Sequence, residues 1–131
     1  MYSFGVSTDI SFEVELLRRT NCEIHAFDPT VGKLPFHNLE SNVLSSLSDQ
    51  QRNRIQLHKI AMGHLSGASA THSLNEQFHD IMHRLGHSFV NILKVDIEGG
   101  EWDIFQKLFN QHQPHEVNDL LPVGQIIIEL H

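Results

Sequence analysis

The chain has 131 residues, 40% of them hydrophobic and 19% charged, which is enough for one domain with a buried core. Its formal net charge of −7 and its lack of a basic run count against binding nucleic acid, because phosphates are held chiefly by clustered lysine and arginine. No stretch is long and apolar enough to span a membrane, and the single cysteine, Cys22, excludes an internal disulfide framework.

Strand-like and helix-like patterns alternate along the chain. Helical spacing of apolar residues recurs within 10–17, 78–85 and 104–109, and irregular segments are expected at 29–48, 63–73 and 112–122. The third of five predicted strands alternates apolar and polar residues, as expected at a sheet edge. Alternation of this kind predicts an α/β fold with a mostly parallel sheet, helices on both faces, and ligands beyond the carboxyl ends of the strands. The predicted strands are 2–6, 23–27, 55–62, 91–95 and 124–130.

The first strand leads into a turn that contains Gly5 and then Ser7, Thr8 and Asp9. A glycine there would let a ligand approach the backbone closely, and the three polar residues are suited to cap the helix that follows. Dinucleotide-binding turns have three glycines, so this turn by itself is better explained as an ordinary capped strand-to-helix connection.

The second strand ends in Phe27-Asp28-Pro29, which places Asp28 23 positions after Gly5. An acidic residue about 20 positions after such a glycine binds ribose hydroxyls in nucleotide-binding folds. Asp28 is equally suited to begin a turn before Pro29. The spacing from Gly5 favours ribose binding.

The fourth strand ends in the most distinctive stretch, 94–102, which contains three carboxylates and two glycines. Carboxylates at the exit of a buried strand indicate a ligand, a metal or a hydrogen-bond network, because buried charge is costly without partners. Asp96 and Glu98 would project on the same side if the strand continued through them. Glu98 and Glu101 would also favour the N-terminus of the next helix without any ligand.

The segments 2–13, 25–30, 93–102 and 125–131 resemble FkbM-type methyltransferases, and the animal methyltransferase-like branch most of all. The resemblance implies a class I, Rossmann-like fold with sheet order 3-2-1-4-5 and S-adenosylmethionine as the cofactor. Such enzymes normally have two further strands, so residues 1–131 are expected to form part of a methyltransferase domain. The methyl acceptor is expected to be a small molecule or a glycan-like compound with a reactive hydroxyl, and nothing in the sequence assigns a compartment.

The same resemblance implies roles for individual residues. Asp96 and Glu98 would lie on the methyl-transfer side and are the candidate catalytic residues, with Glu98 favoured over Asp96 and His131 as a general base. No metal ligand is assigned. The candidate cofactor-binding residues are Phe4, Gly5, Val6, Ser7, Asp9, Asp28, Pro29 and Asp96.

Three other functions compete with this one. A zinc site on one helical face would use His79, His83 and His87, but Gly86 is expected to break that helix. A nucleotide-dependent oxidoreductase would share the fold, yet the glycine-rich turn is missing. An incomplete or inactive scaffolding domain is the main alternative, and its exposed sheet edge would support a homodimer.

Trp102 and two histidines near these segments are expected to have structural roles. Trp102 is placed to stack on a ligand, but packing against a neighbouring helix is the favoured expectation. His25 and His58 lie within predicted strands and are expected to be structural.

Overall fold

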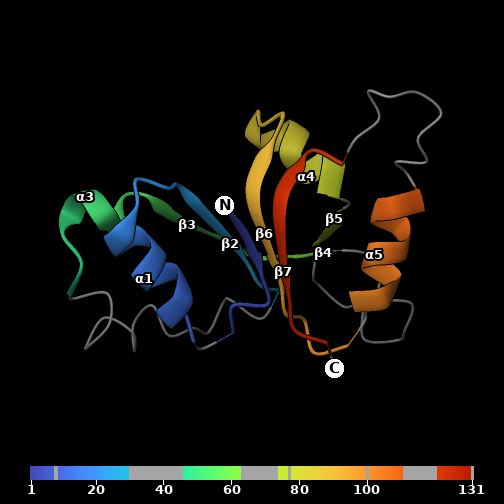
Figure 1. The fold of residues 1–131 in the computed structure, drawn as a ribbon, viewed down its shortest axis with the longest axis horizontal. Helices are drawn as coiled ribbons and strands as arrows, with labels where there is room; N and C mark the ends of the chain where they lie inside the picture. Colours follow the sequence, from blue (N-terminus) through green and yellow to red (C-terminus); the bar gives the residue numbers. More distant parts are fainter. Residues whose placement is uncertain are drawn as a thin grey trace.

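The computed structural model describes residues 1–7, 9–29, 46–62, 74–76, 78–99, 101–110 and 121–130. Its centre is a five-stranded sheet in which every neighbouring pair is parallel, in the order β3-β2-β1-β6-β7 (Figure 1). In sequence order this is the 3-2-1-4-5 arrangement, so the predicted fold class and strand order are confirmed. The strands are β1 (Tyr2–Phe4), β2 (Ile24–Phe27), β3 (Ile55–His58), β6 (Val90–Val95) and β7 (Val123–Ile128).

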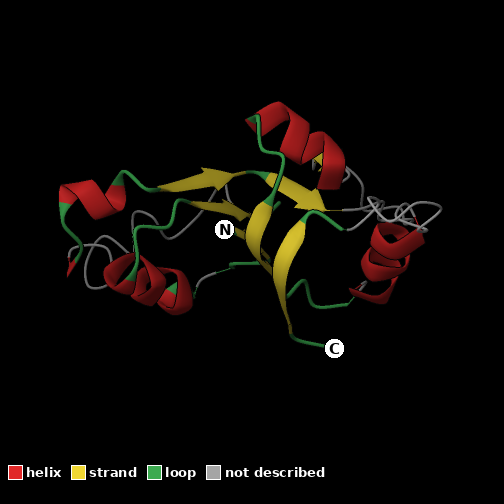
Figure 2. Cartoon of the chain, turned by 45° about the horizontal axis from the view of Figure 1, so that its top comes forward, coloured by secondary structure: helices red, strands yellow, loops and turns green. Residues whose placement is uncertain are grey.

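Helices cover both faces of this sheet, as predicted (Figure 2). Helix α1 (Ser11–Arg19) packs through Val14 and Leu17 on one face, where the core also contains Ile24 and Ala26 of β2. Helices α4 (Phe78–Leu85) and α5 (Glu101–Asn110) pack on the other face, against a larger core built around aromatic residues of β1 and β2. None of the described helices has the length and apolar character needed to cross a membrane.

The strand predicted over 55–62 forms two strands instead of one. Strand β3 ends at His58, opposite Phe27, which is the last residue of β2. Because β2 has ended there, the next residues leave the main sheet, and β4 (Ile60–Met62) pairs in parallel with β5 (Leu74–Glu76) in a separate two-stranded sheet. The predicted end at Gly63 lies outside the described residues.

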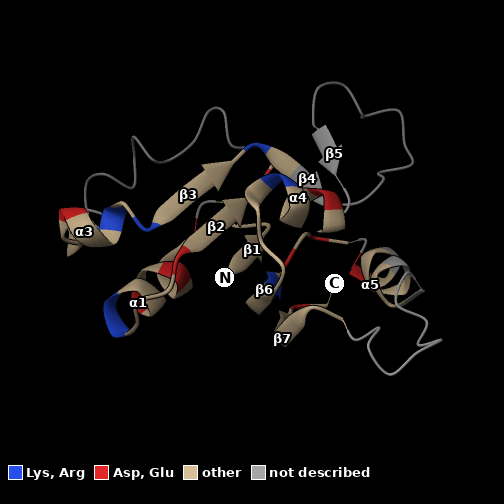
Figure 3. Cartoon of the chain, turned by 90° about the horizontal axis from the view of Figure 1, so that it is seen from above, with Lys and Arg blue, Asp and Glu red and all other residues tan. Residues whose placement is uncertain are grey.

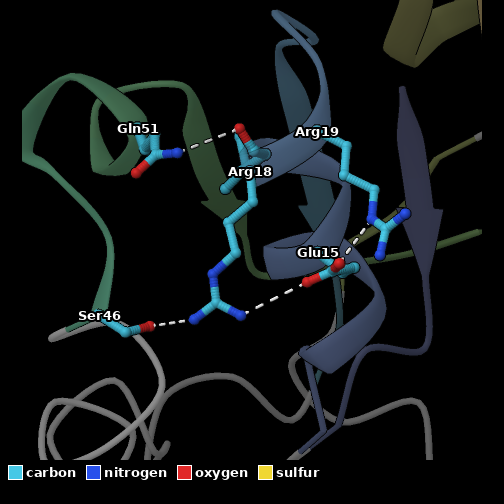
Figure 4. Close-up of polar contacts among 6 residues, drawn as sticks. Glu15, Arg18, Arg19, Ser46 and Gln51 are labelled. Carbon is cyan, nitrogen blue, oxygen red and sulfur yellow. Dashed lines mark hydrogen bonds and ion pairs between the residues drawn. The ribbon is translucent and has the colours of Figure 1, made fainter.

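A short helix, α3 (Asp49–Arg52), precedes β3 and was not predicted. It begins with a capping box in which Ser48 and Gln51 satisfy each other's backbone amides. The Gln51 side-chain amide also donates to the carbonyl of Leu17 in α1, over 3.5 Å (Figure 4).

The outer surface of α1 carries a chain of exposed ion pairs (Figure 4). Arg19 donates to Glu15 over 2.5 Å, while Arg18 lies 3.4 Å from Glu15 and donates to the hydroxyl of Ser46. Exposed pairs one helical turn apart contribute only about 0.3–0.5 kcal/mol each, so the fold depends mainly on the two apolar cores.

Candidate functional site

The carboxyl ends of three neighbouring strands bring the predicted site residues to one edge of the sheet. Phe4, the last residue of β1, pairs with Phe27 of β2 on one side and with Val95 of β6 on the other. Gly5, Asp28 and Asp96 each follow directly after one of these three residues. The register therefore places the start of all three connecting loops side by side.

Gly5 is required by a contact between two of these loops. Its φ angle is +78°, and a Cβ atom on it would lie 1.5 Å from the carbonyl oxygen of Asp96. Its amide donates to the carbonyl of Phe27 over 2.9 Å, and the amide of Asp96 donates to the carbonyl of Phe4 over 3.1 Å. The glycine thus allows the end of β6 to close onto the turn after β1.

Asp28 fastens the turn after β1 to the end of β2. Its side chain is buried, and Oδ2 accepts a hydrogen bond of 2.8 Å from the backbone amide of Ser7. Ser7 has a φ angle of +41°, a conformation that is uncommon for a residue with a side chain. The carboxylate therefore supports the backbone of the turn, which the spacing alone did not predict.

The apolar residues of this turn face the cores. Phe4 and Val6 are both buried, Phe4 in the cluster beneath α4 and α5 and Val6 in the cluster beneath α1. Only their backbone groups can therefore belong to a binding surface at the strand ends. Pro29 is partly exposed directly after Asp28.

Asp9 is the polar residue that meets the start of α1. Its Oδ1 accepts a hydrogen bond of 2.9 Å from the amide of Ser11, and this bond lowers the pKa of the carboxyl. The residue at the N-cap position is Ile10, which makes no side-chain cap. Thr8 lies outside the described residues, and Ser7 is engaged with Asp28.

The loop after β6 is held by Glu101, the first residue of α5. Its side chain is 1% exposed, and Oε1 accepts from the amides of Ile97 and Gly99 over 3.2 and 3.1 Å. The strand ends at Val95 and Glu98 has a φ angle of +60°, so the condition for Asp96 and Glu98 to project on the same side is not met. Figure 3 shows the acidic character of this loop in red.

Two charged residues that the sequence analysis missed, Lys94 and Glu13, lie close to Asp96. The ammonium of Lys94 is 3.9 Å from Oδ2 of Asp96 and 3.7 Å from Oε1 of Glu13, a fully buried residue of α1. Both had a signal in the sequence. Lys94 is a charge within an apolar strand, and Glu13 follows Ile10 by three positions, on the buried face of its helix.

The three histidines considered as a zinc site do not share one helical face, because the helix ends before Gly86 as expected. Helix α4 ends at Leu85 and Gly86 has a φ angle of +72°, so His87 leaves the helical face of His79 and His83. The Nδ1 of His87 lies 2.7 Å from the hydroxyl of Tyr2 instead. No group of three or more potential ligands in the described part of the chain could hold a metal ion.

Two other expectations for rings have different outcomes. The predicted packing of Trp102 against a helix is wrong, because 72% of the side chain is exposed at the start of α5. His25 is buried, and its Nδ1 lies 3.0 Å from Nε2 of His58. This contact fits the structural role expected for both residues.

The parallel 3-2-1-4-5 sheet, covered by helices on both faces, defines a Rossmann-like α/β domain of the methyltransferase type. The protein family described as a methyltransferase domain matches residues 1–131, and the chain belongs to this family.

The chain is also similar to two curated relatives. It is 31% identical over 133 residues to the human probable methyltransferase-like protein 24 and 29% identical over 138 residues to the rat protein of the same name. The matches cover 100% of the chain and 32% of each relative, so the chain spans about a third of their length. No solved structure gives a significant match.

Proposed function

We propose that this chain binds S-adenosylmethionine and serves an FkbM-type methyltransferase that modifies a hydroxyl of a small-molecule or glycan-like acceptor. The observation that carries the proposal is the meeting of Gly5, Asp28 and Asp96 at one edge of a parallel sheet. Ligands of such sheets bind beyond the carboxyl ends of the strands, where the order of the strands reverses. Here the reversal lies at β1, between β2 and β6.

The charges at this edge fit the proposed cofactor better than a dinucleotide. Asp9, Asp28 and Asp96 are all acidic and all lie on loops that leave β1, β2 or β6. S-adenosylmethionine carries a sulfonium and an ammonium group against a single carboxylate, so it is net positive, whereas NAD carries two phosphates that would be repelled. A carboxylate can also accept two hydrogen bonds from the hydroxyls of a ribose.

Each candidate residue has a role in this proposal. Asp28 would hold the ribose, with Pro29 beside it. The backbone from Phe4 to Ser7 and the side chain of Asp9 would line the methionine part, and Asp96 would lie on the side of the reacting methyl group. The buried side chains of Phe4 and Val6 restrict both residues to backbone contacts.

When bound, the cofactor would supply an activated methyl group for direct displacement by the acceptor oxygen. The chain would align the two molecules and exclude water. We assign Glu98 as the base that takes the proton of the acceptor hydroxyl, because it is exposed on the acidic loop, two residues beyond Asp96. Replacement by Glu98→Gln should lower turnover of an identified acceptor and flatten its pH dependence; unchanged turnover across pH would remove Glu98 from this role.

The exposed ring of Trp102 supports a glycan-like acceptor. Its side chain lies four residues beyond Glu98 and offers an apolar face to which a sugar ring can bind. Trp102→Ala should raise KM for a glycan acceptor while the affinity for S-adenosylhomocysteine stays unchanged. Phe109→Ala is the control, because Phe109 is 54% exposed at the far end of the same helix.

The first experiment is calorimetry of the purified chain with S-adenosylhomocysteine (SAH), with NAD as the control ligand. Asp28→Ala should abolish binding. Asp28→Asn separates the support of the turn from the binding of the ribose, because the amide oxygen can still accept from Ser7. Asp49→Ala is the matched surface control, since Asp49 is exposed on α3. A folded chain that binds no SAH would favour the scaffolding alternative.

A further inference from the structure

A line of polar side chains lies beneath α1, on the face of the sheet that is otherwise apolar. Ser3 of β1 and Lys94 of β6 are register partners on neighbouring strands. Leu93 and Val95 point into the core beneath α4 and α5, so Lys94 between them projects towards α1. Ser3 and Lys94 therefore present a hydroxyl and an ammonium group to the same helix.

Glu13 of α1 meets this pair and is 0% exposed. Its Oε1 accepts a hydrogen bond of 2.5 Å from the hydroxyl of Ser3 and lies 3.7 Å from the ammonium of Lys94. Its Oε2 is buried and has no hydrogen-bond partner among the described residues. A buried carboxylate is costly without a counter-charge, and Lys94 supplies one.

Lys94 also reaches the candidate site. Its ammonium lies 3.9 Å from Oδ2 of Asp96, and 17% of its side chain is exposed. Hydrogen bonds from Ser11 lower the pKa of Asp9, and the positive charge of Lys94 lowers it further. One lysine thus acts on carboxylates from α1, from the turn after β1 and from the loop after β6.

We propose that Lys94 is a positioning residue, which uses the buried charge of Glu13 as an anchor to hold the carboxylate of Asp96 on the methyl-transfer side of the site, where it would meet the ammonium group of the cofactor's amino-acid part. This inference rests on the proposed function. The distances of 3.7 and 3.9 Å are those of ion pairs and exceed ordinary hydrogen-bond lengths. Lys94 therefore acts on both carboxylates through its positive charge.

The competing explanation is that Lys94 only neutralises Glu13 and so stabilises the fold. The two explanations differ in what a second substitution restores. Lys94→Met leaves a buried negative charge, whereas Lys94→Met with Glu13→Gln removes that charge too. If Lys94 acts only on stability, the double variant recovers both folding and ligand binding. If Lys94 positions Asp96, only folding recovers.

The test combines thermal unfolding with calorimetry of SAH and of methylthioadenosine, which lacks the amino-acid part. We expect Lys94→Met to lower the Tm and the double variant to regain most of it. In the double variant, SAH should bind about tenfold more weakly, equivalent to about 1.4 kcal/mol, while methylthioadenosine binds as it does to the wild type. Lys94→Arg should restore SAH affinity because it keeps the charge. Arg19→Met, which removes an exposed positive charge from α1, is the control.

Recovery of SAH affinity in the double variant would overturn the inference, as would an equal loss for both ligands. A wild-type chain that binds methylthioadenosine and SAH equally well would also overturn it, because Asp96 would then not act on the amino-acid part. Failure of the wild-type chain to bind either ligand would instead count against the proposed function itself, and the inference would fall with it.

Discussion

The carbonyl oxygen of Asp96 occupies the space in which a side chain on Gly5 would begin, 1.5 Å from the position of a Cβ atom. The contact joins the turn after β1 to the loop after β6, and Gly5 also has a φ angle of +78°. Gly5→Ala should therefore destabilise the fold by at least about 3 kcal/mol, because a methyl group there would force the two strand ends apart. Urea unfolding measures the change.

Gly86→Ala is the matched control for this prediction. Gly86 also has a positive φ angle, +72°, but nothing lies within 4 Å of its Cβ position. Only backbone strain is added there, so the expected cost is about 1 kcal/mol. Equal costs at the two positions would mean that the contact with Asp96 carries no weight.

The sequence could predict the meeting of Gly5, Asp28 and Asp96 because their positions follow from topology. Each lies directly after an apolar stretch, and parallel strands of adjacent register end at the same edge. The periodic patterns also predicted the three long helices, whereas the strand order was implied by the family resemblance. What failed was local: the stretch 55–62 reads as one strand, but β2 ends too early to pair with all of it.

The polar contacts of the site could not be predicted in the same way, because they depend on pairs that are distant in sequence. Glu13 and Lys94 become neighbours only when α1 covers the β1–β6 pair. The positive φ angle of Glu98 ends the alternation that would have placed it beside Asp96. A charge at a buried helical position was the available signal, but it identifies a partner only after the fold is known.

Glu101 should be essential to the shape of the loop after β6. Its Oε1 accepts from the amides of Ile97 and Gly99, and both donors lose their partner in Glu101→Ala. Because Glu101 is 1% exposed, we expect a loss of about 2–4 kcal/mol in urea unfolding. Glu101→Gln keeps an acceptor oxygen and should cost clearly less. A similar loss in both variants would assign the effect to the charge of Glu101 instead of these hydrogen bonds.

The edge of β7 that faces away from β6, which is unpaired within the described residues, should support a homodimer. Within the described residues β7 pairs only with β6, and Ile128 and Leu130 near its end are 38% and 56% exposed. Exposed strand edges pair readily with another chain. Light scattering should give a dimer mass for the wild type and a monomer mass for Ile128→Lys with Leu130→Lys. Phe109→Lys should stay dimeric, and a monomeric wild type would exclude this interface.

Acid should weaken the fold through His25, which is buried near four other groups that affect its protonation. Burial, together with the nearby His58, His87 and N-terminal ammonium, lowers the pKa of His25 from 6.5 to about 4, while Glu23 opposes the change. The unfolded chain binds the proton below pH 6.5, but the folded chain resists it until about pH 4. The contribution to stability is therefore complete above pH 6.5 and is lost as the pH falls towards 4.

The difference between a pKa of 6.5 in the unfolded chain and about 4 in the folded chain corresponds to roughly 3 kcal/mol of folding stability. Urea unfolding at pH 7 and at pH 5 should show a decrease in stability that is smaller in His25→Phe, which has no proton to bind. His83→Gln, at an exposed position of α4, should keep the wild-type decrease. An identical decrease in His25→Phe and in the wild type would show that other groups, such as the carboxylates at the strand ends, cause the acid sensitivity.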